Sequence, residues 1–498
     1  MRAPALSLAA LFSLLALGGC LLGPDYERPA IDTPAAFRFS DADTKDLADT
    51  AWWEQFRDPA LNQLIATALA DNKDVKTAAA RVEQFLGQFV TTRAQLFPQA
   101  AAGFNAQRER VPLGTTQLPP GTSPVFNQFQ GTLSASWEID FFGKLRRQTE
   151  SARANLLASE EGRRATILTL VAGVATSYIS LVSLDRQLVI AKSTVKSRAA
   201  SVNVFQLRFA GGQVGQMELA QSQSEYEASL VTIPQIELQI AQQENALSIL
   251  LGHNPDAVPR DRELDDLTVP AVPAGLPSEL LERRPDLRQA EFDLIAANAQ
   301  IGAARALYFP SISLTGLLGT ASGQFSSLFT GPARVWSYAG AVTLPIFTAG
   351  SISGQVKQAE ALQQQALFQY QKAIQVAFQE VADALVSLQK TREQLAVQGR
   401  EVDALATYSR LARLRYEGGY TSYIEVLDAE RSLFNAQLSY AQTQGAVLTS
   451  SVDLYKAMGG GWVTDAERMT PVSYGANGAV QNPAAGGSKQ ASAPQVSP

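Results

Sequence analysis

The stretch FQGTLSASWEID, residues Phe129 to Asp140, alternates between two kinds of side chain over its whole length. Every second residue is apolar or glycine, and the residues between them are polar or charged. A period of two is typical of a β-strand with one apolar and one polar face. Most of the remaining chain has the pattern of long helices, so the strand raises the question of which apolar medium contacts its first face.

An internal duplication of the chain tests this strand. LRFAGGQVGQMELAQSQSEYEA from Leu207 is similar to LRYEGGYTSYIEVLDAERSLFNA from Leu414, an offset of 207 residues. The same offset places WSYAGAVTLPIF opposite the strand, and its apolar face has the predicted parity: Trp336, Tyr338, Gly340, Val342, Leu344 and Ile346. Upstream of the strand the offset becomes 212, which indicates a loop-length difference of five residues between Pro98 and Ser134.

Each half also has a second candidate strand shortly before the first. These are QAAAGFNAQ, residues 99–107, and SISLTGLLG, residues 311–319. Loops rich in Gly and Pro separate the two members of each pair, as in a β-hairpin. We therefore predict one hairpin per half, over residues 99–141 and 311–347, and four strands in the chain.

The rest of each half is predicted to be helical. No proline occurs from Lys144 to Arg208 or from Ser351 to Tyr416, so each stretch can form a helix of roughly 100 Å. Apolar residues recur in the first stretch at the spacing of a coiled-coil seam: Ile167, Val171, Val174, Tyr178, Leu181 and Leu188. Shorter helices are expected to stack end to end in pairs beside the long ones: Ala60–Phe97, Met217–Leu251, Pro285–Phe309 and Ile424–Met458.

One part of the first long helix, Thr166 to Leu184, has no charged residue. Its counterpart in the second half, Ala373–Thr391, contains Glu380, Asp383 and Lys390. Two equivalent helices do not lie one in lipid and one in water, so we expect a packed helix face here and not a membrane span.

The segments outside the two repeats are irregular, and we expect them to form a belt around the middle of the helical body. The last residues are rich in Gly, Ala, Pro and Ser and are predicted to be disordered. The organisation is then a signal peptide (1–19), a lipidated N-terminal segment (20–59), a first repeat (60–251), an equatorial linker (252–284), a second repeat (285–458) and an equatorial segment with a tail (459–498).

The N-terminus has the pattern of a secretory signal: one arginine, an apolar stretch and small residues that end at Cys20. The sequence LGGC resembles the lipobox of bacterial lipoproteins, which implies S-diacylglycerol and an N-acyl group on Cys20. Leu21 in place of aspartate indicates sorting to the outer membrane. The alternative is an ordinary cleaved signal with a chance cysteine.

Composition excludes several classes of function. A net charge of −6 and a pI near 5.2 give no basic surface for nucleic acid. One His, one Cys and four Met leave few ligands for a transition metal, and no other cofactor is expected. No Ser/His/Asp pattern surrounds His253, so we expect no catalytic residue and no enzyme activity.

Four strands cannot close a barrel, and open sheet edges are not tolerated in lipid. Transmembrane barrels begin at about eight strands. Two copies of the chain supply eight strands and three copies supply twelve, and a through-channel favours twelve because small barrels are filled by side chains. The apolar face of Phe129–Asp140 is then expected to contact lipid, with Glu138 and Asp140 toward a lumen.

Five stretches carry a resemblance to a known family: CLLGPDYERP, LPSELLERRPDLRQAE, ARALYFPSISLTGLLG, WEIDFFGKLRRQTESARA and RYEGGYTSYIEVLDAERSLFNAQL. From Cys20 to about Met458 the chain resembles the outer-membrane factors of tripartite efflux systems, the TolC-like or NodT-type lipoprotein channels. The resemblance implies a mainly α fold with a transmembrane β-barrel: a homotrimer whose twelve strands continue into a periplasmic coiled-coil tunnel. It implies a passive outer-membrane channel for small molecules such as drugs. The implied partners are a periplasmic adaptor, an inner-membrane pump of the resistance-nodulation-division type and outer-membrane lipid.

The candidate gate lies in the second repeat, at the turn that joins its long helix to the following shorter helix, after Gly418 and Gly419. Ser422 and Glu425 have the S-x-x-E spacing of a capping box, which predicts a structural role for Glu425. The resemblance assigns the tunnel constriction to Asp428 and to Ile424 one turn earlier. In the first repeat these positions are Gln221 and Met217, so one acidic ring is expected. The alternative for Asp428 is a favourable charge near a helix start.

Three further residues are candidates for the links that hold the coils closed. Arg415 and Tyr416 lie at the neighbouring helix end, where the family uses polar links, although helix capping and ring packing explain them equally well. Arg431 lies at i+3 from Asp428 and is predicted to pair with it within the chain.

Three other functions remain open from the sequence. A type I protein-secretion duct has the same fold. A structural coiled-coil lipoprotein between outer membrane and cell wall explains Cys20 and the helices but leaves the four strands unused. A surface hydrolase is opposed by the lack of a candidate triad or metal cluster.

Overall fold

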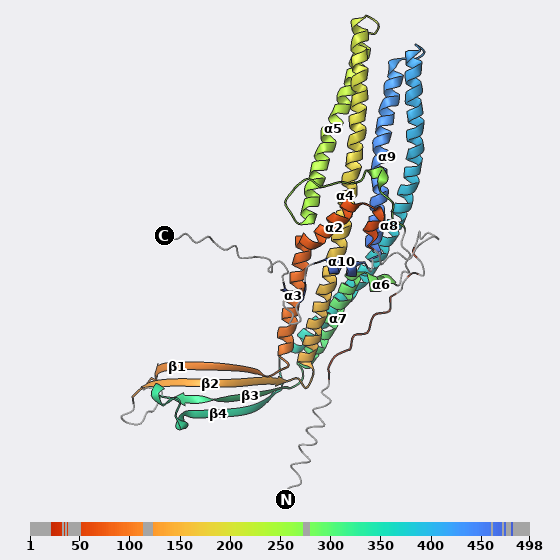
Figure 1. Cartoon of the computed structure of the whole chain (residues 1–498). Coiled ribbons are helices and arrows are strands. Elements are labelled where there is room, and N and C mark those ends of the chain that lie inside the picture. The colour runs from red at the N-terminus through yellow and green to blue at the C-terminus, as the bar shows by residue number, and fades with distance from the viewer. Residues whose placement is uncertain are drawn as a thin grey trace, which may run out of the picture. The chain divides into compact units, whose positions relative to one another are not determined.

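The computed structural model describes residues 21–31, 34, 37, 51–112, 123–271, 279–459, 462–470, 473–474 and 480–481 (Figure 1). Cys20 lies outside the described residues. The chain divides into two compact units. Unit 1 contains residues 1–30, 82–159 and 289–370, and unit 2 contains residues 31–81, 160–288 and 371–498.

Unit 1 contains one antiparallel sheet with the strand order β1-β2-β3-β4 (Figure 1). The two hairpins, one from each repeat, are joined through β2 and β3. The outer strands β1 and β4 each pair on one side within the chain. The strand bounds are Gln99–Arg110 (β1), Val125–Ile139 (β2), Ser311–Ser322 (β3) and Arg334–Thr343 (β4).

The register confirms the predicted parity. Leu133 pairs with Ala102 on one side and with Leu318 on the other, and Leu318 pairs with Trp336. These side chains therefore lie on one face, and Leu133, Leu318 and Trp336 are 54%, 62% and 69% exposed. Within the part of the chain that the structure describes, nothing therefore covers this row of large apolar side chains.

The predicted strand ends were less accurate than the parity. β4 ends at Thr343, so Leu344 and Ile346 lie beyond the strand in which we placed them. Pro345 has no N–H and cannot continue the ladder, which explains the early end. β1 and β3 extend past the predicted segments, while β2 begins earlier, at Val125, and ends at Ile139, one residue before Asp140. Two 3-10 turns, Phe325–Ser327 (η4) and Gly331–Ala333 (η5), connect β3 to β4.

The two long helices and the shorter ones form where the sequence predicts, with one exception. The stretch Ala60–Phe97 is not one helix, because α2 ends before Asn72 and α3 begins after it. The main helices are Pro59–Asp71 (α2), Lys73–Ala94 (α3), Lys144–Ala210 (α4), Gln216–Leu251 (α5), Pro285–Ala306 (α7), Ser351–Glu417 (α8) and Tyr423–Ala457 (α9). Short helical segments are Trp52–Phe56 (η1), Leu264–Asp266 (η2), Leu280–Arg283 (α6) and Val463–Met469 (α10).

The break at Asn72 has a local cause. Its side-chain oxygen accepts hydrogen bonds from the backbone N–H groups of Asp74 and Val75, at 2.8 and 3.0 Å, and so caps α3. Its amide donates to the carbonyl of Leu250 at 2.9 Å, near the end of α5. One side chain thus starts a helix and joins it to the end of another.

The second repeat builds the same joint with a charged residue. Arg284 donates to the carbonyl of Ala457 at 3.1 Å, and Ala457 corresponds to Leu250 at the offset of 207. Arg284 also forms ion pairs with Asp286 and with Glu380 of α8, both at 2.7 Å. Burial alone lowers the pKa of Arg284, but the two carboxylates outweigh burial and raise the pKa above its ordinary value, so this residue stays charged.

The uncharged part of α4 is a packed helix face. Among the described residues, α4 is the one helix long and apolar enough to cross a membrane, but 67% of its most apolar window is buried in the protein. Five residues of the predicted seam have no exposed surface: Ile167, Val171, Val174, Tyr178 and Leu181. Tyr178 donates a 2.7 Å hydrogen bond to buried Asp58, whose other oxygen caps α2. These contacts belong to the core of unit 2, which also includes Trp52, Trp53 and Trp462.

We predicted from the sequence that the whole tail is disordered, and this prediction is wrong for four of its residues. Ser473–Tyr474 (β5) and Val480–Gln481 (β6) form a short antiparallel ladder.

Lysine on the two faces of the sheet should have different effects. Leu133→Lys places a charge on the exposed apolar face, and with the lipid contact that the sequence predicts for this face the charge should cost about 2–4 kcal/mol. Ser134→Lys is the matched control on the polar face. We expect Leu133→Lys to lower the amount of folded protein in the membrane fraction and its denaturation midpoint, and Ser134→Lys to change neither. Equal behaviour of the two variants would contradict the assigned parity.

Candidate functional site

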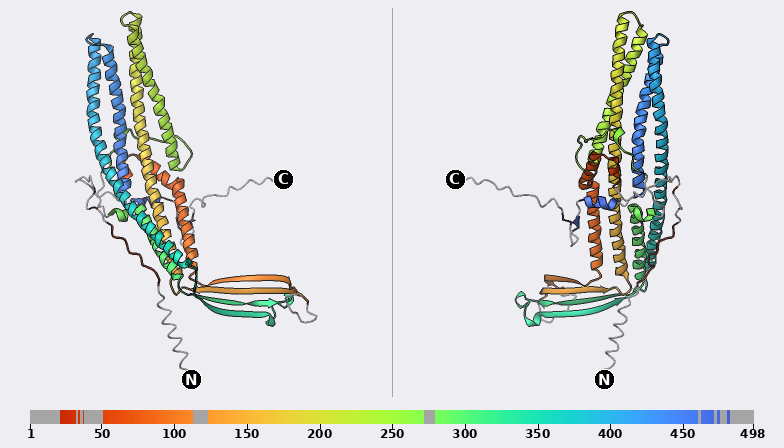
Figure 2. Two further views of the ribbon diagram at one scale, coloured as in Figure 1. Left: turned by 180° about the vertical axis from the view of Figure 1, so that it is seen from behind. Right: turned by 45° about the vertical axis from the view of Figure 1, so that its right-hand side comes forward.

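The candidate site lies where each long helix of unit 2 turns into a shorter one (Figure 2). The two turns are built alike. The backbone N–H of Gln213 donates to the carbonyl oxygen of Arg208, and the backbone N–H of Tyr420 donates to the carbonyl oxygen of Arg415, both at 2.8 Å. Gly212 and Gly419 have φ values of +68° and +76°, the left-handed conformation that ends a helix. GGQVG in the first turn is therefore a helix-ending turn and not a phosphate loop.

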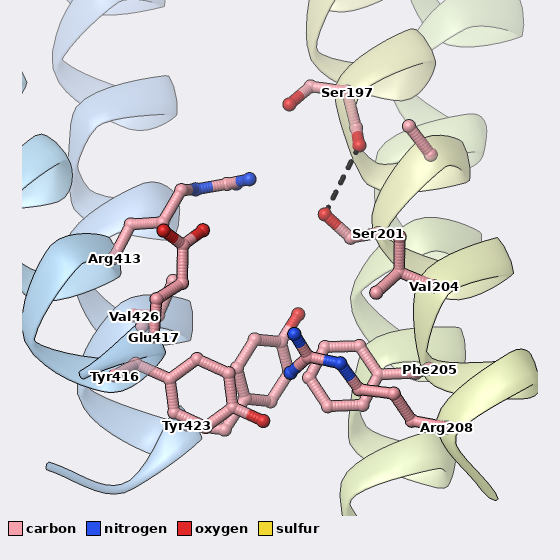
Figure 3. A pocket seen from close by; sticks show the side chains of 11 residues that line it. Ser197, Ser201, Val204, Phe205, Arg208, Arg413, Tyr416, Glu417, Tyr423 and Val426 are labelled. Carbon is pink, nitrogen blue, oxygen red and sulfur yellow. Dashed lines mark hydrogen bonds between the residues drawn. The ribbon is translucent and has the colours of Figure 1, made fainter. Parts of the chain in front are cut away.

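Three aromatic rings connect the two helical hairpins near these turns (Figure 3). The ring of Phe205 on α4 lies 4.1 Å from that of Tyr423 and 6.1 Å from that of Tyr416, measured between centroids. Tyr416 and Tyr423 are 5.2 Å apart. Burial raises the pKa of Tyr423, so its hydroxyl stays neutral at ordinary pH. Tyr416 thus occupies a packed position between the hairpins.

A groove of about 200 Å³ lies beside the rings (Figure 3). Polar residues from both hairpins line it: Ser197, Ser201 and Arg208 on α4 and Arg413 and Glu417 on α8. Arg413 pairs with Glu430 of α9, and Arg198 pairs with Glu225 of α5 at 3.1 Å. These two cross-helix ion pairs were missed from the sequence, because neither has the i+3 or i+4 spacing that reveals a pair within one helix.

The capping box is a correction to the sequence analysis. Ser422 occupies the N-cap position of α9, but its side chain makes no capping hydrogen bond. Glu425 instead accepts a hydrogen bond from the hydroxyl of Thr421, the residue before Ser422. The S-x-x-E spacing located the start of the helix correctly, while the neighbouring threonine replaced the predicted serine as the partner of Glu425.

Asp428 and Ile424 lie on one face of α9, one turn apart, and both are exposed. The pairing predicted at i+3 is present, because Arg431 Nη2 lies 2.8 Å from Asp428 Oδ1. Both side chains of this pair are more than half exposed, so the pair contributes little to the stability of the chain. The carbonyl oxygen of Arg415 accepts the hydrogen bond from the backbone N–H of Tyr420 that closes the turn.

Comparison with known proteins identifies the class of this molecule. A sequence model described as outer membrane efflux protein matches residues 64–253 and 276–460. The chain belongs to the outer membrane efflux protein family. It is 39% identical over 454 residues to the probable efflux pump outer membrane protein TtgC of Pseudomonas putida, covering 90% of this chain and 93% of the relative. It is 38% identical over 454 residues to the cation efflux system protein CusC of Escherichia coli, with 90% and 97% covered.

Solved structures agree with this assignment. The outer membrane channel CmeC of Campylobacter jejuni superposes with a TM-score of 0.84 at 26% identity, over 91% of this chain and 99% of that one. The open-state outer membrane channel MtrE of Neisseria gonorrhoeae gives a TM-score of 0.81 at 33% identity, with 89% and 99% covered. The chain is therefore an efflux channel of the outer membrane that extends into the periplasm. Within the described residues, no group of three or more His, Cys, Asp or Glu could hold a metal ion.

Proposed function

We propose that three copies of the chain close a twelve-stranded barrel that continues into a helical tunnel. The observation that carries this proposal is the four-stranded sheet with an exposed apolar face and two unpaired edges, β1 and β4. Backbone groups at open edges have no partner in lipid, and joining β4 of one copy to β1 of the next satisfies them. Three copies contribute three times four strands, enough for a water-filled lumen.

The assembly conducts small molecules passively from a periplasmic adaptor and an inner-membrane pump of the resistance-nodulation-division type to the exterior. Relatives at 36–39% identity are named for pumps of antibiotics, toluene and solvents, which supports this substrate class. CusC is named for cation efflux. The relatives named for antibiotics, toluene and solvents favour a small-molecule duct over a protein-secretion duct.

The tunnel is gated at the start of α9. Three copies of Ile424 and Asp428 narrow it, and Arg415, Tyr416 and Arg431 belong to the links that keep it closed. Three carboxylates around one axis repel one another and attract cations. Arg431 opposes both effects, because it pairs with Asp428 in each copy. A partner that binds the open state more tightly shifts the equilibrium toward opening.

Cys20 carries the lipid anchor. The diacylglycerol and the N-acyl group together hold the N-terminus in the membrane more stably than a single acyl chain would. The segment from Leu22 to Arg28 is fixed to the helices of unit 1, which keeps the anchor close to the barrel.

Purified protein in a planar lipid bilayer tests the function. We expect stepwise single-channel conductance that prefers cations, because Asp428 lines the narrowest part of the tunnel. Protein that binds the bilayer without conducting would instead support a structural lipoprotein.

Two substitutions in the gate should have opposite effects. Asp428→Ala removes the ring of carboxylates and should weaken block by divalent cations about tenfold, within the range of effects expected of a focused charge. Arg431→Ala frees the carboxylates and should strengthen the block. Current–voltage curves in bilayers with added Mg²⁺ measure both. The same shift in both variants, or none, would leave Asp428 with a role at the helix start only.

Cys20→Ser should prevent lipidation and leave an unprocessed precursor. Labelled palmitate in growing cells measures this, and wild-type protein should take up the label while the variant takes up none. Label in the Cys20→Ser protein would contradict the lipobox assignment.

A further inference from the structure

The residues directly after Cys20 form a strap along α7. Arg28 donates to Glu291 at 2.7 Å, and Tyr26 donates to the same carboxylate at 3.1 Å. The carbonyl of Pro24 accepts from Asn298 at 3.1 Å. The strap therefore runs antiparallel to α7, so that its N-terminal residues contact the C-terminal part of the helix. It leads to the end of α7 that precedes β3.

A buried arginine of α4 fixes the far end of the strap. Arg147 is 2% exposed and donates to the carbonyls of Leu22 and Gly23, at 3.0 and 3.3 Å, and to Asp25 at 2.7 Å. On the other side Gly23, with φ +92°, lies against Gly302 of α7. A Cβ added at Gly302 would lie 2.5 Å from the carbonyl oxygen of Leu22, so this contact has no room for a side chain. The position of Leu22 is therefore set from two helices.

A cavity begins about one turn beyond these contacts on both helices. It has a volume of about 380 Å³, and its lining includes Phe141, Phe142, Leu307 and Phe309. The ring of Phe142 contacts those of Phe141 and Phe309, with centroids 5.1 and 4.9 Å apart. The volume is within the range of about 300–1,000 Å³ that is usual for small-molecule sites.

Cys20 can reach this cavity. It is two residues before Leu22, a distance of up to about 7 Å along the chain. Lys144, which also lines the cavity, precedes Arg147 by three residues, or about 4.5 Å of helix, and Leu307 follows Gly302 by about 7.5 Å. We propose that the cavity binds an acyl chain of the lipid on Cys20, so that the anchor docks on its own protein. The proposal rests on the lipidation of Cys20 proposed above.

The charges at the cavity favour this occupant over a bilayer phospholipid. Its charged lining residues are Glu138, Asp140 and Lys144. Lys144 pairs with Glu138 at 2.6 Å, and Asp140 pairs with Arg146 and accepts from the N–H groups of the first turn of α4. Both cations, Lys144 and Arg146, are therefore already paired with carboxylates and are not free to bind a phosphate. The diacylglycerol of a lipoprotein has no phosphate, whereas a phospholipid brings one.

Photo-crosslinking in the intact outer membrane tests the proposal. p-Benzoylphenylalanine replaces Phe309, which is 40% exposed, in full-length protein from cells fed labelled palmitate. After illumination and trypsin digestion, the expected product joins residues 306–334 to the acyl chains of the lipopeptide, residues 20–38. The same crosslinker at Leu318 is the matched control: it lies in the same fragment but on the lipid face, and it should capture phospholipid only.

Two glycine variants test whether the strap positions the lipid. Gly302→Ala displaces Leu22 and should abolish the product at Phe309 while palmitate still labels Cys20. Gly87→Ala, where an added Cβ meets nothing within 4 Å, should leave the product unchanged. Phospholipid captured at Phe309, a product that joins two copies of the chain, or labelled protein without the product would overturn the cavity assignment alone. Protein that takes up no palmitate would overturn the lipidation proposal as well.

Discussion

The unpaired edges of β1 and β4 are the constraint on which the rest of this channel depends. Every backbone N–H and C=O group at a sheet edge in lipid lacks a partner, and each such group costs several kcal/mol. One chain supplies four strands and leaves both edges open. The row Leu133, Leu318 and Trp336 is exposed, as a sheet in contact with lipid requires, and in the proposed assembly neighbouring copies of the chain provide the missing pairs. In the proposed assembly the pore is thus a consequence of hydrogen bonding in a medium without water.

Duplication gives the chain two similar halves, and charge distinguishes them. The joint between stacked helices uses Asn72 in the first repeat and Arg284 in the second, bound to the equivalent carbonyls of Leu250 and Ala457. The second joint adds an ion pair to its long helix, through Glu380. The helix after the second turn has Asp428 where the first has Gln221. At these two positions the first repeat has neutral residues, and the acidic residue of the proposed gate belongs to the second repeat.

The sequence predicted the strands well because two independent patterns agreed. A period of two set the faces of β2, and the offset of 207 required the same faces in β4, as the register shows. Helix breaks and caps were harder, because short side chains compete for the same backbone groups. Asn72 divides an otherwise continuous helical pattern, and Thr421 takes the place of Ser422 as the partner of Glu425. The contacts of Arg147 with the strap were not predictable, since they join residues more than 120 positions apart.

Native mass spectrometry of the detergent-extracted outer-membrane protein tests the central claim most directly, because it counts the chains that close the sheet. The account predicts a complex of three chains, with no stable species of two, since two copies supply only eight strands and leave little room for a lumen. A folded, membrane-extracted species of one or two chains would contradict the closed twelve-stranded barrel and the channel built on it.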